Sequence, residues 1–354
     1  MPNARSGKKD FGVFLPVANG GWIISDTTPK LDGLWKQNLA AAVTADEVGM
    51  DFVMSMGKWR GFGGDTNHWG SSMESVTMMA GIAQATKRVK IWATAHTLVH
   101  NPAVIAKMIT TLDHISGGRA GLNIVAGAYK DEFDQMGLWD DTLSHDDRYV
   151  LAEEWTDIIK RLWSEQSVTH DGRFFQMKDC VSDPKPLSRP RPDLICAGMS
   201  DRGFRFSVRE SDACFIGGRS YDELRDASRR AKTVAAEMGT HIKTYAMCTV
   251  IHADTDAKAD ALVDYYREGT DMGAIINMLK SWGVPPERLS TVAEAQGPFM
   301  TQTMVGSPAT CAEKVEHYMD YCELDGLMMI FPDYVDGLKM FGSEILPRMH
   351  TVPA

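Results

Sequence analysis

The sequence predicts a (β/α)8 barrel of the α/β class, in which eight parallel strands alternate with helices. Eight short apolar runs recur along the 354 residues. Longer segments with helical spacing and Gly or Pro breaks lie between them, which is typical of repeated βα units. The main alternative, a doubly wound open sheet, would normally carry a Gly-rich fingerprint after its first strand. Neither Gly-x-Gly-x-x-Gly nor Gly-x-x-x-x-Gly-Lys-Ser/Thr occurs in the chain.

The expected elements follow one another in order. The apolar runs predict strands at 11–15, 52–56, 89–93, 120–125, 194–196, 213–216, 245–251 and 327–330. The helical spacing predicts helices at 34–48, 74–86, 102–115, 149–162, 221–238 and 311–321. Before the fourth strand, the pair Gly117-Gly118 supplies a turn with positive backbone angles, and Gly127 allows a bend where that strand ends.

Residues 11–354 are expected to form one domain, because α/β barrels often exceed ~250 residues as a single unit. Residues 1–10 are polar and basic and predict a flexible arm. The interval 254–304 is too long for one crossover helix, and 167–191 is a Pro-containing insert, so both are expected to be extensions of the barrel. Insertions of this kind commonly cover an active site at the C-terminal face of the strands.

The composition is that of an ordinary soluble protein, with 44% hydrophobic and 24% charged residues. The formal net charge of −10 and the lack of a Lys/Arg cluster argue against a nucleic-acid partner. No apolar run reaches ~18 residues, so no membrane segment is predicted. The six cysteines are widely spaced, as expected of buried thiols in a reducing cytoplasm. The histidines are scattered and predict no metal site.

Candidate ligand-binding side chains follow the first three strands, since barrel enzymes act at the C-terminal ends of their strands. Trp22 is expected either to wall a pocket or to pack on the surface. The second strand leads into a Gly-rich segment, where Lys58 or Arg60 could meet a negative charge or lie in a solvated turn. Thr94 and His96, after the third strand, could both point at a ligand, although Thr is also a common strand residue.

The fourth strand contains Asn123, an amide on an otherwise apolar strand. Such a group needs hydrogen-bond partners, so Asn123 is either a satisfied core amide or part of a site. Glu132, a little further on, is either a site group or a solvated carboxylate at a helix start. In the segment 145–149 the acids are expected to cap a helix, whereas Arg148 and Tyr149 together suit a phosphate or a ring carbonyl.

The turn after the fifth strand, Gly198-Met199-Ser200, leads into a helical segment. A turn of this kind predicts a phosphate-binding site built from backbone N–H groups. The chain carries no Gly-x-Ser-x-Gly nucleophile elbow. A cofactor is therefore the economical source of chemistry for a site lined by Asn, Thr, Arg, Tyr and Gly.

Six short motifs are spread over nearly the whole chain. They are Phe11-Gly-Val-Phe-Leu-Pro, Ser55-Met-Gly-Lys-Trp-Arg-Gly-Phe-Gly-Gly, Ala93-Thr-Ala, Ile115-Ser-Gly-Gly-Arg, Asp147-Arg-Tyr and Phe341-Gly. Together they resemble the bacterial luciferase-like, FMN-dependent monooxygenases. The resemblance implies a (β/α)8 barrel that binds FMN at the strand C-termini, uses O2 as cosubstrate, and receives reduced FMN from a separate NAD(P)H:flavin reductase. It also implies a cytoplasmic homo-oligomer, either a dimer or a tetramer.

The resemblance assigns roles to individual residues. Thr94 and Asn123 match the pair that positions O2 beside the flavin, and Glu132 lies near the flavin ring, so these three are the candidate catalytic residues. Arg148 and Tyr149 are implied toward the ribityl-phosphate. The full implied flavin-binding set is Gly57, Lys58, Thr94, Asn123, Glu132, Arg148, Tyr149, Gly198, Met199 and, at the phosphate, Ser200. The implied substrate pocket consists of Trp22, Met56, His96, Ala128 and Tyr129.

Within the family, the motifs are most similar to those of members that open a pyrimidine ring such as uracil through a flavin peroxide. Ala128 stands where those members have an aromatic residue, and His96 and His100 replace smaller or apolar residues, so the pocket is altered. A sulfone, another N-heterocycle or a halogenated aromatic is therefore an alternative substrate. Outside this chemistry, the alternatives are an F420-dependent oxidoreductase, which shares the barrel, and a flavin-binding protein without turnover.

Overall fold

The computed structural model describes residues 8–127 and 129–349. A closed barrel of parallel strands forms its core, and the order around the barrel is β1-β2-β3-β4-β7-β8-β9-β11. These strands are β1 (Asp10–Phe14), β2 (Phe52–Met54), β3 (Lys90–His96), β4 (Ala120–Val125), β7 (Asp193–Cys196), β8 (Ala213–Phe215), β9 (Lys243–His252) and β11 (Gly326–Ile330). The expected (β/α)8 fold and its eight strands are confirmed. Of the expected arm, residues 1–7 lie outside the described residues, and Asp10 already belongs to β1.

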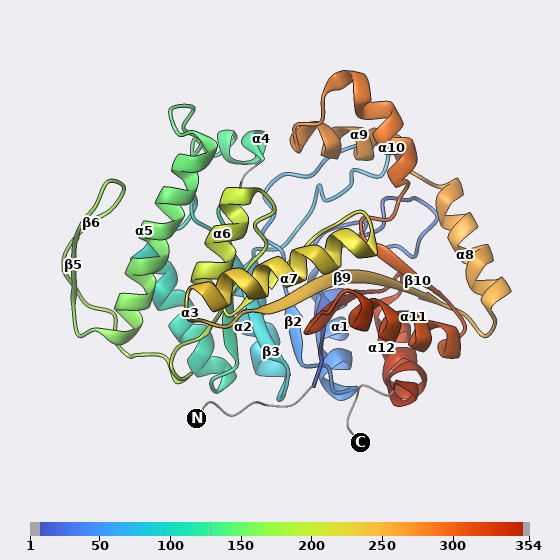
Figure 1. The fold of residues 1–354 in the computed structure, drawn as a ribbon, viewed down its shortest axis with the longest axis horizontal. Coiled ribbons are helices and arrows are strands. Elements are labelled where there is room, and N and C mark those ends of the chain that lie inside the picture. The colour runs from blue at the N-terminus through green and yellow to red at the C-terminus, as the bar shows by residue number, and fades with distance from the viewer. Residues whose placement is uncertain (1–7, 128, 350–354) are drawn as a thin grey trace.

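Helices connect the strands and cover the outside of the barrel (Figure 1). They are α1 (Trp35–Glu47), α2 (Ser75–Ala85), α3 (Pro102–Ser116), α4 (Lys130–Asp134), α5 (His145–Ser164), α6 (Asp201–Glu210), α7 (Tyr221–Glu237), α11 (Pro308–Tyr321) and α12 (Tyr334–Met340), after which short turns span Phe341–Ile345 and Leu346–Arg348. The start of α5 was placed at 149 by the sequence, but the helix begins at His145 because Ser144 and Asp147 form a capping box. None of the helices in the described part of the chain is long and apolar enough to cross a membrane.

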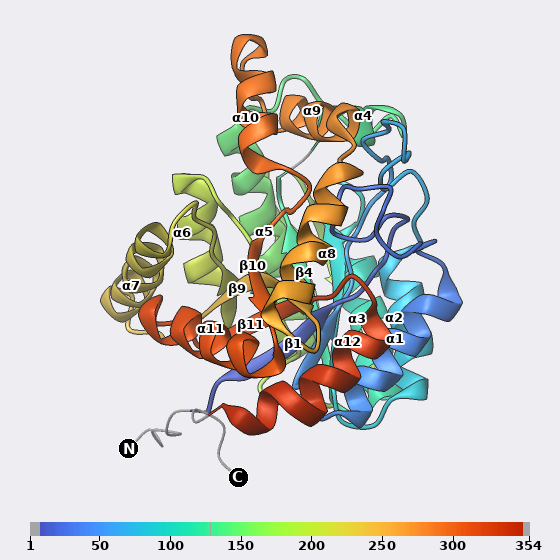
Figure 2. The ribbon, with the colours of Figure 1, turned by 90° about the vertical axis from the view of Figure 1, so that its right-hand side faces the viewer.

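The extension 254–304 forms three helices and leads into a further strand. The helices are α8 (Asp256–Glu268), α9 (Met272–Ser281) and α10 (Leu289–Gln296), with a 3-10 turn at Pro286–Arg288. The strand, β10 (Gln302–Gly306), pairs with 248–252 of β9, beyond the residues that pair with β8. The sequence predicted no strand here, and the first residues of β10 lie within the expected extension 254–304. Figures 1 and 2 show α4, α9 and α10 at the same end of the barrel, where β4 ends.

The other extension, 167–191, contains a hairpin that packs on α5. Its strands are β5 (Val168–Asp171) and β6 (Gln176–Cys180). The Glu154 carboxylate of α5 accepts the N–H groups of Phe174 and Phe175, and its Oε1 lies 3.0 Å from His170 Nε2. The hairpin therefore lies along the outer side of α5 (Figure 1).

Aromatic rings fill the N-terminal end of the barrel. The Phe52 ring stacks on Trp92 with centroids 4.0 Å apart, and Tyr245 lies 5.6 Å from Phe52 and 6.0 Å from Trp92. Glycines on neighbouring strands make room for them, because a Cβ at Gly12 would lie 2.1 Å from the Phe52 ring and one at Gly121 would lie 2.3 Å from Trp92. This packing fills the N-terminal end of the barrel, and barrel enzymes act at the opposite end, where the strands terminate.

Candidate active site

Thr94 and Asn123 face each other across neighbouring strands. They are register partners on β3 and β4, and Asn123 Nδ2 donates to Thr94 Oγ1 at 3.0 Å. The Thr94 hydroxyl in turn donates to the Ser55 carbonyl, and the Thr94 N–H donates to Ser75 Oγ at 2.7 Å. Both side chains are buried, with exposed fractions of 3% and 6%. The structure therefore brings together the two residues that the sequence singled out.

The carbonyl oxygen of the Asn123 side chain has no hydrogen-bond partner among the described residues, although it is buried. Buried polar atoms in native proteins are almost always paired, so this acceptor, in the C-terminal half of β4, is open to a hydrogen-bond donor from water or a ligand. Its neighbour Thr94 fixes the other half of the amide. The NH2 group of the Asn123 side chain is thus hydrogen-bonded, whereas its carbonyl oxygen is free to accept a hydrogen bond.

His96 and Gly57 pack beside this pair. A Cβ at Gly57 would lie 2.6 Å from His96 Cε1 and 3.3 Å from Thr94 Cγ2, so only glycine allows the second-strand loop to approach β3 this closely. Burial, together with the nearby positive charges of His100 and Lys58, lowers the pKa of His96 to about 3. The imidazole is therefore neutral at physiological pH. Met56, one residue before Gly57, is partly buried against the core.

Lys58 and Glu132 form a buried ion pair. Lys58 Nζ lies 3.0 Å from Glu132 Oε2, and the two side chains are only 7% and 4% exposed. The other carboxylate oxygen accepts the Trp59 N–H at 2.5 Å. Burial lowers the pKa of Lys58, and Glu132 opposes that shift. Three aromatic rings lie 4.6, 5.9 and 5.1 Å from the ammonium, namely Phe62, Trp69 and Tyr129. The pair joins the loop after β2 to α4.

The turn after β7 places Ser200 at the N-terminus of α6. The Ser200 hydroxyl accepts the Gly203 N–H at 3.0 Å, and the Ser200 carbonyl accepts the Phe204 N–H at 2.7 Å. The two earlier N–H groups of the first turn have no helical partner, as at any helix start. Gly198 is required here because a Cβ would lie 2.2 Å from the Gly203 carbonyl oxygen. The turn therefore presents free backbone donors.

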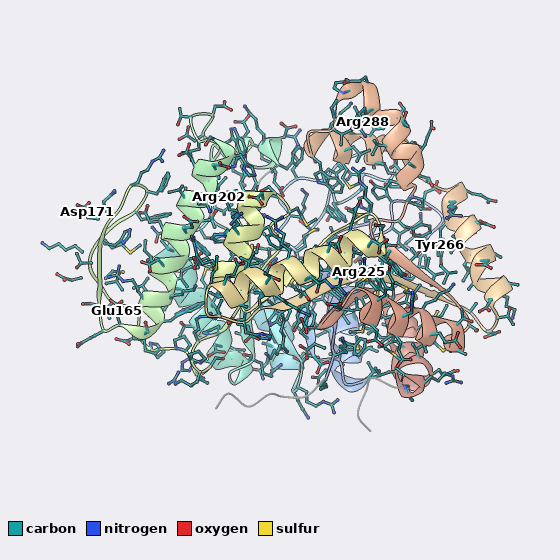
Figure 3. All side chains as sticks on the ribbon, in the orientation of Figure 1. Glu165, Asp171, Arg202, Arg225, Tyr266 and Arg288 are labelled. Atoms are coloured by element: carbon teal, nitrogen blue, oxygen red, sulfur yellow. The ribbon has the colours of Figure 1, made fainter. Side chains whose placement is uncertain are left out.

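Arg148 and Tyr149 approach the same turn from the first turn of α5. The Arg148 Nη1 donates to the Leu143 carbonyl at 3.1 Å, but its Nε is buried without a partner among the described residues. The Tyr149 hydroxyl lies against Gly203, where a Cβ would be 2.2 Å from its oxygen, and burial raises the pKa of the phenol. Arg202, labelled in Figure 3, lies where α6 meets α5 and pairs with Glu153 at 2.6 Å. The phenol of Tyr149 thus lies against the α6 N-terminus and its free N–H groups, which suits a phosphate, while the Arg148 guanidinium contacts the Leu143 carbonyl and the Trp139 ring.

Some of the expected site residues do not join these clusters. Trp22 is 6% exposed, stacks on Phe14 with centroids 3.8 Å apart and donates to the Leu15 carbonyl, so it lies in the hydrophobic core. Met199 is 65% exposed at the surface of its turn. Ala128 lies outside the described residues. No group of three or more His, Cys, Asp or Glu side chains within 8–127 and 129–349 could hold a metal ion.

A cavity of about 680 Å³, here called the α9 cavity, lies next to the ion pair. It is lined by residues 59–63, 129–131 and by Asn67, Gly70, Gln135, Asn277, Lys280 and Ser281. Among the described residues of the expected substrate pocket, Tyr129 lines it. The α9 side chains were missed because the sequence showed only that 254–304 was too long for a single helix.

Asp271 and Asn277 fasten α9 over this cavity. Asp271 caps α9 by accepting the Ala274 N–H at 2.9 Å, and it also accepts the Thr66 N–H at 2.7 Å. Burial alone would raise the pKa of Asp271, but these N–H groups and the Thr66 hydroxyl lower it below its usual value. Asn277 Nδ2 donates to the Phe62 carbonyl at 2.8 Å. The extension is therefore held on the loop after β2.

His68 is fully buried and lies near Asp271, one of the two residues that hold α9 on the loop after β2. Both of its ring nitrogens lack a partner among the described residues, and burial lowers its pKa to about 4, with Asp271 opposing the shift. Between pH 6.5 and about 4 the unfolded chain binds a proton that the folded chain does not. The stability that His68 contributes is therefore fully present above pH 6.5 and is lost as the pH falls toward 4.

We expect the variant His68→Phe to be less sensitive to acid than the parent protein. Phe keeps the stacking on Trp69 but cannot be protonated. The slope of the unfolding free energy between pH 6.5 and 4.5 should fall by ~1.4 kcal/mol per pH unit, as measured by urea titration at several pH values. The exposed His241→Gln is the control and should leave the slope unchanged. An equal slope in His68→Phe and the parent would show that His68 is protonated in the folded state.

Fold and site together define a class of protein: a barrel enzyme that works with a bound organic cofactor at its strand ends. The model of the family described as Luciferase-like monooxygenase matches residues 10–321. The chain belongs to this family, and it is an enzyme of the flavin-dependent monooxygenase type.

Individual relatives agree with this assignment. The chain is similar to the pyrimidine monooxygenase RutA of Stutzerimonas stutzeri (strain A1501), with 35% identity over 350 residues and 97% of each chain covered. Among solved structures, riboflavin lyase (RcaE) has a TM-score of 0.85 at 18% identity, covering 96% of this chain and 91% of that one. Long-chain alkane monooxygenase (LadA) has a TM-score of 0.82 at 18% identity, covering 96% and 90%. At these identities the two structures show the fold alone.

Proposed function

We propose that this protein is the oxygenating component of a two-component system. It takes FMNH2 from a separate NAD(P)H:flavin reductase and uses O2 to oxygenate a pyrimidine-type cyclic amide, with opening of the ring. The observation that carries the proposal is the buried Asn123 acceptor, which has no partner among the described residues and whose amide is held by Thr94 in the C-terminal halves of β3 and β4. The name of the relative from Stutzerimonas stutzeri supports a pyrimidine as substrate.

The residues at the strand ends fit FMN. The open Asn123 oxygen is suited to a ring N–H, and the orphaned Nε of Arg148 is suited to a phosphate oxygen. Gly198 and Ser200 keep the α6 N-terminus open to an anion. When bound, reduced FMN would supply the electrons that activate O2.

The chain's own residues position the reactants and exclude water. Thr94 and Asn123 place a hydroxyl and an amide in buried surroundings, where small polar groups act strongly on developing charge. His96 is neutral and adds no charge there. Glu132 is committed to Lys58 and to the Trp59 N–H, so we assign it a positioning role rather than that of a base.

The direct test is a coupled assay with FMN, NADH, a flavin reductase and uracil under isotopically labelled O2. The expected product is a ring-opened amide that carries one labelled oxygen, identified by mass spectrometry. Parallel reactions with a sulfone, a second N-heterocycle and a halogenated aromatic test the other substrate classes. Reduced F420 offered without FMN tests hydride chemistry. Labelled product from none of the substrates would reject the proposed function.

We also expect Arg148→Gln to weaken FMN binding. Loss of the guanidinium removes a charge-assisted contact to the phosphate, and the dissociation constant should rise about tenfold or more in a fluorescence titration. Riboflavin, which lacks the phosphate, should bind the variant and the parent equally. Arg288→Gln, an exposed arginine beyond α9 (Figure 3), is the control. Equal FMN affinity in Arg148→Gln and Arg288→Gln would place the phosphate elsewhere.

A further inference from the structure

The α9 cavity carries an excess of positive charge. Arg60, Lys130 and Lys280 line it, against the single carboxylate of Asp131. The whole chain, by contrast, has a formal net charge of −10. A cationic cavity on an acidic protein attracts and concentrates anions.

Two of these cations, Arg60 and Lys280, have no ion-pair partner among the described residues. Lys130 pairs with Asp141 at 2.6 Å, and the Asp131 carboxylate accepts from the Tyr129 hydroxyl at 3.2 Å. The side chains of Arg60 and Lys280, in contrast, make no ion pair or hydrogen bond within 8–127 and 129–349. They come from the loop after β2 and from α9, which meet over the cavity.

The cavity does not need these cations for its own structure. The buried Glu132 carboxylate next to it is already balanced by Lys58 at 3.0 Å. The loop after β2 and α9 are joined without Arg60 or Lys280, through the Asp271 and Asn277 contacts. The two free cations are thus available to a ligand.

The other walls favour a planar ring. Trp59, Phe62 and Tyr129 supply aromatic surface, and Gln135 Nε2 is fixed on the Trp59 carbonyl at 2.8 Å. Aromatic walls with a few oriented amides are typical of sites for small planar ligands. The volume of about 680 Å³ admits a substituted ring together with water.

We propose that the α9 cavity binds a planar N-heterocycle that carries a carboxylate, with Arg60 and Lys280 as the partners of that carboxylate. The inference rests on the proposed function and narrows its substrate class from neutral pyrimidines to heterocyclic carboxylates. Arg60 and Lys280 are then the specificity-determining residues. They act on substrate choice, whereas Thr94 and Asn123 serve the oxygenation itself.

The test compares uracil with orotate, which is uracil with a ring carboxylate. Binding to the full-length protein with oxidised FMN is measured by calorimetry at low and high salt. Orotate should bind about tenfold or more tightly than uracil at low salt, and the difference should shrink at high salt. Lys280→Gln and Arg60→Gln should each weaken orotate binding about tenfold and leave uracil binding unchanged. Lys36→Gln, an exposed lysine on α1, is the matched control.

Equal binding of the two compounds, or orotate binding that is unaffected in both variants, would overturn the inference. Weaker FMN binding in Lys280→Gln or Arg60→Gln would also overturn it, because the cations would then serve the cofactor. Turnover completes the comparison, since oxygenation of uracil but not of orotate would refute the substrate class and keep the proposed function. Orotate binding that depends on both cations, without oxygenation of either compound, would support the cavity assignment and reject the proposed function.

Discussion

Replacement of Lys58 by Met is expected to cost ~3–5 kcal/mol in the stability of the region that joins the loop after β2 to α4. Met fills nearly the same volume but removes the charge, so Glu132 would remain as a buried carboxylate without its counter-ion. Only the Trp59 N–H would still stabilise it. An uncompensated buried charge is among the most destabilising single changes in a protein.

Hydrogen exchange of the Trp59 amide provides the measurement, since this N–H is bonded to the Glu132 carboxylate. In Lys58→Met its protection should drop strongly, and urea titration should show a lower unfolding midpoint. The double variant Lys58→Met/Glu132→Gln removes both charges and keeps an acceptor for Trp59, so it should recover most of the loss. Unchanged protection in the single variant would show that the pair is solvated rather than buried.

Most of the barrel could be predicted because its strands are apolar on both faces. The run 120–125 was assigned with the bounds that the structure shows, and the other barrel strands differ from their expected bounds at the ends. The strands of the outer hairpin were missed because they are polar and exposed, as in Gln176–Cys180. Strand β10 was missed because it lies at the edge of β9 rather than in the barrel. Its first residues, 302–304, lie inside the segment that had already been assigned to the extension.

The candidate site likewise contains contacts that the sequence predicts and contacts that it does not. Thr94 and Asn123 lie on adjacent strands, so the strand register alone brings them together. The ion pair between Lys58 and Glu132 joins residues 74 positions apart through two loops, and no local pattern indicates it. The free cation of α9, Lys280, looks like any solvated helix lysine in the sequence. Lys280 becomes part of the cavity wall because Asp271 and Asn277 hold α9 over the loop after β2.

Replacement of Thr94 by Val is expected to lower the oxygenation rate about 100-fold, because one oriented polar group would be lost from a dry site. Val preserves the shape of the side chain. It leaves Asn123 Nδ2 and the Ser55 carbonyl without the hydroxyl that bridges them, so the amide is no longer fixed beside its open oxygen. FMN should still bind, since the substitution leaves Arg148 and Ser200, the residues proposed to hold its phosphate, unchanged.

The coupled assay separates these effects through product formation and NADH consumption. In Thr94→Val, labelled product should fall while NADH oxidation continues, since reduced flavin would still react with O2 without transferring oxygen to substrate. Thr110→Val on α3 removes an equally buried hydroxyl that bonds the Ala106 carbonyl, and it should change stability but not the product yield. A normal yield in Thr94→Val would assign the Thr94–Asn123 bond to strand pairing alone and leave Asn123 as the only polar group of this pair acting on the reaction.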